Sequence, residues 1–162
     1  MAESFTERWA KKERDCGLTG IASRMVPFGK DLLPDTAAPF LSFERAHDPR
    51  LIWQVYGFET DWSPEDRQRL APYQMMGSDG AGNAICVDER NGTVVLLDHE
   101  DGFRTRQFMN SSVGQLAECL LAYMGERSPE AFKSAVLAID RDAMASGTFW
   151  SIEATQIENT EA

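Results

Sequence analysis

The two histidines are the side chains in this sequence best suited to acid–base chemistry near neutral pH. They are His47 and His99, so a hydrolase with a histidine base would have to use one of them. His99 precedes Glu100 and Asp101, and carboxylates beside an imidazole can orient it, hold it protonated or complete a metal site. Neighbouring residues of a strand point to opposite faces, however, and the sequence contains no HxH, HExxH or GxSxG pattern. We therefore expect a solvated run of charges at 99–101, no catalytic residue and no metal.

The cysteines could bind zinc or form disulfides, but their number and spacing argue against both. There are three, Cys16, Cys86 and Cys119, and no two of them form a CxxC pair. We expect reduced thiols. Cys119 stands beside a hydrophobic stripe with nothing nearby in sequence that would lower its pKa, so it reads as a small, partly buried hydrophobe.

A glycine-rich segment at 77–83 could cradle a phosphate or a calcium ion. A dinucleotide-binding loop needs the third glycine of the GxGxxG spacing and a following helix, whereas the residues from Ala84 to Val87 continue as a strand. The calcium pattern also fails, because Ser78 and Gly80 stand where carboxylate ligands are needed if Ile85 is the hydrophobic anchor. The segment is thus expected to be a turn that enters a strand, and no cofactor is expected.

A β-hairpin should follow this turn. Asn91-Gly92 lies between apolar runs at 85–89 and 93–98, and both residues tolerate the positive φ of a two-residue type I′ turn. The register that this turn predicts pairs Val87 with Leu96 and Cys86 with Leu97.

Both faces of the predicted hairpin are apolar. One face carries Ile85, Val87, Val94 and Leu96, and the other carries Ala84, Cys86, Val95 and Leu97. We expect the hairpin to lie centrally in a sheet that is covered on both sides.

Several helices are expected around this sheet. The clearest predicted helix starts after a capping box of Ser112 and Gln115. Its apolar face consists of Val113, Leu116, Ala117, Leu120, Leu121 and Met124. Ser128-Pro129 starts another helix, and residues 5–16 carry a looser stripe. Residues 51–56 read as an early strand and residues 151–162 as an acidic C-terminal tail. The fold class predicted is α+β: one domain at 1–150 with a central, mainly antiparallel sheet flanked by helices.

The order of these motifs resembles the SUKH superfamily, also described as SMI-KNR-like, and within it the fourth subgroup. The resemblance rests on the Gly-Asp turn at 77–83, the Asn91-Gly92 tip, the Asn-Ser step at 110–112 and the upstream segment LLPDTAAPFLSF, and it covers roughly residues 32–125. It implies a SUKH-like fold and a binding module. Most bacterial members are immunity proteins of polymorphic toxin systems, which implies a cognate protein toxin as the partner. The alternative is a non-enzymatic regulatory or interaction module on the same scaffold, as the eukaryotic members suggest.

The charge balance is compatible with such a partner. The net charge is −10 and the sequence pI is near 4.6, which disfavours binding to nucleic acid or to an anionic membrane. A basic partner is favoured, and a nuclease toxin must carry a positive cleft to hold phosphate. The sequence has no apolar run of about 18 residues, and its charged first 14 residues do not resemble a signal peptide, so we expect a cytoplasmic protein. Its oligomeric state is left open.

The candidate partner-binding residues form two acidic groups. Asp61, Trp62, Glu65 and Asp66 make up the first, with Trp62 as an aromatic anchor in an acidic rim, and Asp98, Glu100 and Asp101 make up the second. Trp62 could instead close the core under a loop. Asp88 and Glu89 are expected at the hairpin tip, at the opposite end of the strands from the second group.

Overall fold

The computed structural model describes residues 3–17, 23–44, 51–56, 62–126 and 128–160. The strands are Met25–Phe28 (β1), Asp31–Pro34 (β2), Thr36–Ala37 (β3), Leu41–Phe43 (β4), Tyr73–Ser78 (β5), Ala84–Asp88 (β6), Val94–Leu97 (β7) and Arg106–Asn110 (β8). The α-helices are Phe5–Asp15 (α1), Ile52–Val55 (α2), Pro64–Leu70 (α3), Val113–Gly125 (α4), Pro129–Ile139 (α5) and Phe149–Thr160 (α6), and the 3-10 helices are His99–Asp101 (η1) and Arg141–Met144 (η2). The predicted α+β class is confirmed.

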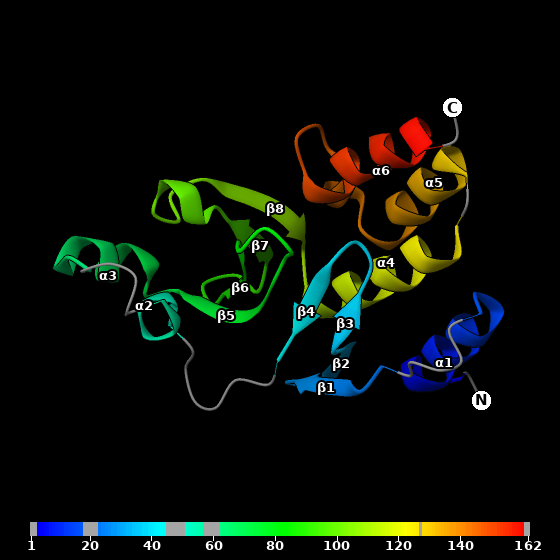
Figure 1. The fold of residues 1–162 in the computed structure, drawn as a ribbon, viewed down its shortest axis with the longest axis horizontal. Coiled ribbons are helices and arrows are strands. Elements are labelled where there is room, and N and C mark those ends of the chain that lie inside the picture. Colours follow the sequence, from blue (N-terminus) through cyan, green and yellow to red (C-terminus); the bar gives the residue numbers. More distant parts are fainter. Residues whose placement is uncertain (1–2, 18–22, 45–50, 57–61, 127, 161–162) are drawn as a thin grey trace.

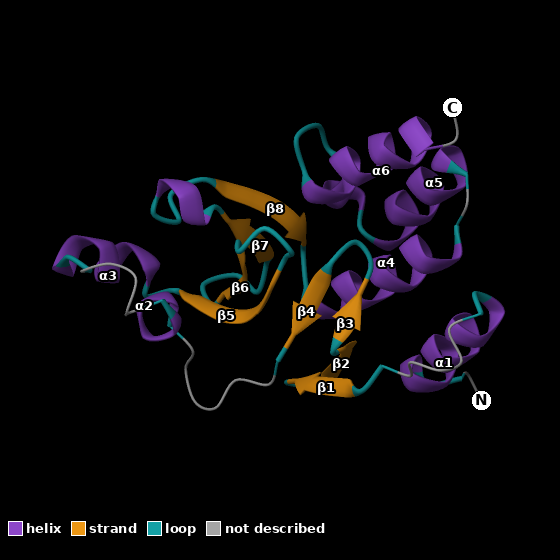
Figure 2. Cartoon of the chain, viewed as in Figure 1, coloured by secondary structure: helices purple, strands orange, loops and turns teal. Residues whose placement is uncertain are grey.

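An antiparallel sheet in the order β3-β4-β5-β6-β7-β8 organises the molecule, and β1 and β2 form a separate two-stranded sheet (Figure 1). Helices α4, α5 and α6 group on one side of the strands, while α2 and α3 lie at the other end (Figure 2). None of the helices in the described part of the chain is long and apolar enough to cross a membrane.

The central hairpin is covered on both faces, as its alternation predicts. Ile85, Val94 and Leu96 join the larger core with residues of the helical layer, and Val87 packs against this core. Ala84, Cys86, Val95 and Leu97 join a second core with Ile52, Leu70 and Phe103. The second core lies beneath α2, α3 and the loop that follows β7.

The predicted hairpin register is wrong by two residues. Val87 pairs with Val94 and Cys86 with Val95. The backbone N–H of Asp88 donates to the carbonyl of Thr93 at 2.8 Å, so the loop runs from 89 to 92 instead of comprising Asn91-Gly92 alone. Side chains alternate with a period of two, so a two-residue shift leaves each side chain on its predicted face.

The buried carboxylate of Asp88 explains this longer loop. It accepts hydrogen bonds from the Arg90 backbone N–H at 3.0 Å and from the Arg90 guanidinium at 2.9 Å, and Arg106 lies 3.6 Å away. The side-chain hydrogen bond from Arg90 is the main reason that the pKa of Asp88 is lowered. Asp88 and Glu89 lie at the tip, as predicted.

The helix starts at 113 and 129 are confirmed. The Ser112 hydroxyl accepts from the backbone N–H of Gln115 at 3.2 Å, and its own proton is donated to the Gln115 side chain at 2.8 Å. Ser128 caps α5 in the same way through the N–H of Ala131, with Pro129 in the first turn.

Two other predictions are wrong. The expected strand at 51–56 is the short helix α2, in which Ile52 is buried and the Gln54 side chain accepts from the Leu51 N–H at 3.1 Å. Residues 151–160, expected in a polar tail, belong to α6. Trp150 and Ala154 lie one turn apart and are both fully buried, so this helix is held by one apolar face.

A buried polar network joins the sheet to the helical layer. Asn110, at the end of β8, accepts from the Trp150 indole N–H at 2.9 Å and donates to Asp140 at 3.1 Å. Asp140, between α5 and η2, also accepts from the backbone N–H and the hydroxyl of Ser111 at 2.7 and 2.8 Å. Three donors thus satisfy a carboxylate that is 4% exposed.

Replacement of Asp88 should destabilise the fold at neutral pH but have a smaller effect in acid. A carboxyl whose folded pKa lies below its ordinary value of 3.8 stabilises the fold above that pH and loses this contribution as the pH falls through the folded pKa. Asp88→Asn should lower the free energy of unfolding by about 1–3 kcal/mol at neutral pH. In urea unfolding, the difference from wild type should shrink below about pH 4.

Glu89→Gln, at the exposed neighbouring position, serves as the control and should change the free energy of unfolding by less than about 0.5 kcal/mol. If Asp88→Asn lowers the free energy of unfolding by as much at low pH as at neutral pH, the charge of Asp88 does not have the stabilising role proposed for it.

Candidate functional site

The described residues of the two acidic groups predicted from the sequence come from neighbouring segments of the structure. Phe103, in the loop after η1, is buried between them and packs against both Tyr56, at a centroid distance of 4.9 Å, and Trp62, at 6.0 Å. The start of α3 therefore meets the 98–105 loop over the second core.

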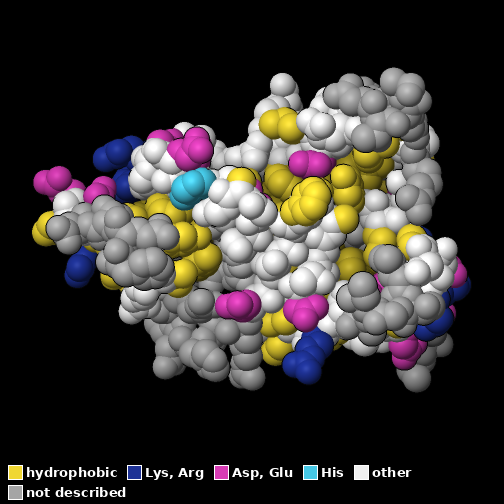
Figure 3. Space-filling model, viewed as in Figure 1, with side chains coloured by type: hydrophobic (Ala, Val, Ile, Leu, Met, Phe, Trp, Pro, Cys, Tyr) yellow, Lys and Arg dark blue, Asp and Glu magenta, His cyan; other side chains and the backbone are white. Residues whose placement is uncertain are grey.

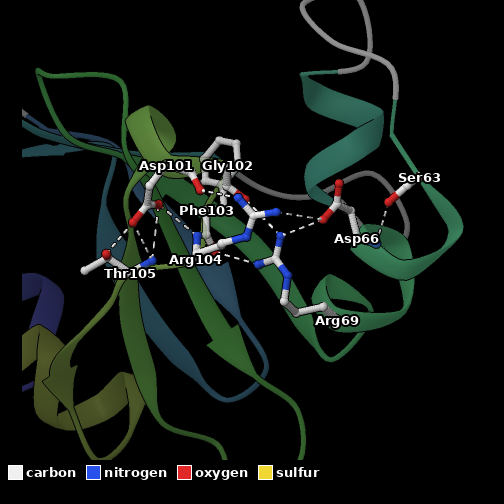
Figure 4. A network of polar contacts seen from close by, with 8 residues as sticks. All are labelled: Ser63, Asp66, Arg69, Asp101, Gly102, Phe103, Arg104 and Thr105. Atoms are coloured by element: carbon white, nitrogen blue, oxygen red, sulfur yellow. Dashed lines mark hydrogen bonds and ion pairs between the residues drawn. The ribbon is translucent and has the colours of Figure 1, made fainter.

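Arg69 connects the two segments (Figure 4). Its guanidinium donates to the carbonyls of Phe103 and Gly102 at 2.9 and 3.0 Å and to the Asp66 carboxylate at 3.1 Å. Arg104 approaches the same carboxylate at 3.9 Å. The hydrogen bond from Arg69, followed by that from Ser63, lowers the pKa of Asp66. Asp66 is therefore an internal partner of two cations.

The carboxylates of Asp98 and Asp101 shape the loop itself. Asp98 accepts from the backbone N–H of Glu100 at 2.8 Å, which caps η1. Asp101 accepts from the backbone N–H groups of Arg104 and Thr105 at 2.9 and 3.0 Å, and also from the Thr105 hydroxyl (Figure 4). This hydroxyl is the first cause of the lowered pKa of Asp101. Both side chains therefore hold backbone in place.

A surface hollow of about 370 Å³ lies where the segments meet. It is lined by Tyr56, Trp62, Asp66, His99, Gly102, Phe103 and Arg104, and we call it the Trp62 hollow. The indole N–H of Trp62 is buried and has no hydrogen-bond partner among the described residues. Trp62 itself is half-buried, so it packs on the core and also forms part of the wall.

His99 is oriented by an amide. The side-chain oxygen of Asn83 accepts from the His99 backbone N–H at 3.1 Å and lies 2.8 Å from ring Nδ1. Because this oxygen is an acceptor, Nδ1 is the donor in this contact. The Asn83 amide is in turn held by Asp79 at 3.0 Å.

Nothing in this geometry resembles a nucleophile–base pair or a metal site. Across residues 3–160, apart from the undescribed segments, no three His, Cys, Asp or Glu side chains are grouped so as to hold a metal ion. Cys86 and Cys119 are buried free thiols, and burial raises the pKa of Cys119 to about 12. The arrangement is suited to binding.

The seven predicted residues thus have different roles. Asp61 lies outside the described residues, and Trp62 forms a wall of the hollow. Asp66, Asp98 and Asp101 are used within the protein. Glu65 and Glu100 are exposed, and their carboxylates make no hydrogen bond or ion pair within the described part of the chain, so they are available to a partner.

Five lining residues were not predicted as part of the site. They are Tyr56, His99, Gly102, Phe103 and Arg104. The signal for Phe103 was present, because it is the one large apolar residue in a polar run between two strands. On the face seen in Figure 3, hydrophobic side chains gather at the end of the molecule where α2 and α3 lie, with charged side chains around them.

Comparison with known proteins gives one match. A family model described as SUKH-4 immunity protein matches residues 26–153. No curated protein and no solved structure matches the chain significantly. The matched range covers the sheet, α2 to α5 and the first turn of α6, and it contains every described residue that lines the Trp62 hollow.

Removal of the Arg69 guanidinium should release the 98–105 loop. Arg69→Met deletes hydrogen bonds to two loop carbonyls, so the loop amides should exchange with solvent about tenfold faster, as expected for a local loss of 1–2 kcal/mol. Hydrogen exchange followed by mass spectrometry measures this, and peptides from β6 should be unchanged.

Arg67→Met is the matched control, since Arg67 is exposed on the same helix. Equal acceleration of loop exchange in both variants would mean that Arg69 does not hold the loop.

Proposed function

The chain belongs to the SUKH-4 immunity protein family, and we propose that it neutralises a cognate polymorphic toxin by binding it through the Trp62 hollow. The match favours this function over a regulatory module on the same scaffold. The proposed mechanism is occlusion: the bound protein covers the active site of the toxin or a surface beside it, and no bond is made or broken.

The unpartnered indole N–H of Trp62 is the observation that supports this position for the interface. A buried donor without an acceptor costs free energy, and a partner that supplies an acceptor would recover it. Tryptophan is also the residue type most enriched among the side chains that dominate binding energies. The hollow adds the oriented ring of His99 and a donor at Arg104, polar groups that would fix the orientation of the partner.

The surroundings of the hollow support a basic partner. The whole chain carries a net charge of −10, and the exposed carboxylates of Glu65 and Glu100 flank the hollow without internal partners among the described residues. A nuclease toxin is proposed as the partner class, because its substrate-binding cleft must be positive. Long-range attraction would then speed association.

Truncation of Trp62 should weaken toxin binding strongly. Trp62→Ala removes the aromatic wall. The binding free energy should become less favourable by more than about 2 kcal/mol, which raises the dissociation constant by a factor of roughly 30. The measurement is calorimetric titration with the toxin domain that co-purifies with the protein, with circular dichroism to establish that the variant is folded.

Trp62→Phe keeps the packing on Phe103 but removes the indole N–H, so it should lose only part of this energy. A folded Trp62→Ala variant that binds with wild-type affinity would place the interface elsewhere.

Charge reversal beside the hollow should slow association. In the double variant Glu65→Lys and Glu100→Lys, the association rate constant at low salt should fall about tenfold, and its dependence on ionic strength should flatten. Stopped-flow mixing with the toxin domain measures both. The control is Glu89→Lys at the opposite end of the strands, which should have a smaller effect. If both variants associate as fast as wild type, the two carboxylates do not steer the partner.

A further inference from the structure

A second hollow, of about 720 Å³, opens between α1, the β3–β4 turn and α4. Its wall includes Trp9 and Glu13 from α1, Phe40 from the turn and Tyr123 and Met124 from α4. We call it the Phe40 hollow. These residues belong to or border the larger core, whereas the Trp62 hollow lies over the second core, so the two are separate sites.

Phe40 is unusually placed for a large apolar side chain. It is 85% exposed and its φ is 61°, in the left-handed region that disfavours residues other than glycine. The Cβ that Gly80 lacks would lie 3.1 Å from the Phe40 Cβ, so the neighbouring β5–β6 turn supports this position closely. Hydrophobic side chains are visible over the β3–β4 turn in Figure 3. The chain thus holds an aromatic ring in solvent at the rim of the hollow.

Two polar groups in the wall have few or no partners among the described residues. Glu13 is 7% exposed, and the donors that its carboxylate has among these residues are the N–H and the hydroxyl of Ser23, each at 3.3 Å. No cationic side chain of the described residues lies within 4.0 Å of it. Trp9, one turn earlier on α1, is 2% exposed, and its indole N–H has no hydrogen-bond partner among the described residues. A buried carboxylate with no cationic partner among the described residues therefore faces a largely apolar hollow.

The geometry is well fixed by the surrounding elements. Arg8 makes a bidentate ion pair with Glu118 of α4 at 2.5 and 2.6 Å, which holds α1 against α4. Trp9 and Glu13 therefore face the hollow from a helix that is anchored before any ligand binds, which keeps the ordering cost of binding low.

We propose that the Phe40 hollow binds a segment of a partner protein in which a Lys or Arg side chain stands beside apolar residues. The cation would pair with Glu13, and the apolar side chains would pack on Phe40, Tyr123 and Met124. The volume lies in the range of sites that enclose such groups. Charge complementarity selects this occupant over a second copy of the chain, because copies with a net charge of −10 repel one another.

Titration with short peptides tests the proposal without the toxin. The probes are the acetylated and amidated tripeptides Leu-Arg-Leu and Leu-Gln-Leu, and the readout is the indole N–H signal of Trp9 in a two-dimensional NMR spectrum. The Arg peptide should shift this signal saturably with a dissociation constant of about 1 mM or lower, and the Gln peptide should bind at least about tenfold more weakly.

Two variants locate the effect. Glu13→Gln keeps the acceptor for Ser23 but removes the charge, and should weaken the Arg peptide about tenfold while leaving the Gln peptide unchanged. Phe40 is exposed, so Phe40→Ser should leave the fold intact. It should weaken the binding of both peptides. Leu137→Ser, at a 49% exposed position on α5, is the matched control and should change neither. An unshifted Trp9 signal with the Arg peptide, or equal affinity for the two peptides, would overturn the proposal.

Discussion

The hydrogen bonds of Asn110 are the interaction on which the rest of the structure depends. This one fully buried side chain, at the end of the last strand, binds the Trp150 indole on one side and the Asp140 carboxylate on the other. A buried carboxylate without its donors would be strongly destabilising, so β8, η2 and α6 must keep their relative positions. The helical layer is thereby confined to one face of the sheet.

Among the described residues, the opposite face is covered by short elements, namely α2, α3 and the 98–105 loop (Figure 1). A hollow lies where they meet. Charged side chains in this cover hold it together: Arg69 fastens α3 to the loop, and Asp98 and Asp101 fix the loop backbone. The described acidic residues that mark the region in the sequence are thus mainly a structural framework. Under the proposed function, recognition falls to Trp62, His99, Arg104, Glu65 and Glu100.

Features with a local or periodic cause could be predicted from the sequence. The two faces of the central hairpin follow from alternation, and α4 and α5 follow from their serine caps and apolar stripes. The predicted hairpin register was wrong because the contact between Asp88 and Arg90 favours a longer turn than the Asn91-Gly92 pair alone predicts. Helix α6 was missed because the apolar residues of its buried face, Trp150, Ala154 and Ile157, stand among polar and acidic residues in a segment expected to be a tail. The contact of Asp140 with Asn110, 30 residues apart, has no local signal.

The residues of the candidate site are likewise brought together by contacts that are distant in the sequence. Trp62 and the 98–101 run were predicted as separate groups, and contacts of Phe103, Arg69 and Arg104 bring them together. The most direct test of toxin binding at the Trp62 hollow is a hydrogen-exchange footprint of the protein bound to its toxin domain. If the toxin binds there, amides at 62–70 and 98–105 should exchange more slowly in the complex than in the free protein. Protection confined to α5 and α6, with these two segments unchanged, would contradict it.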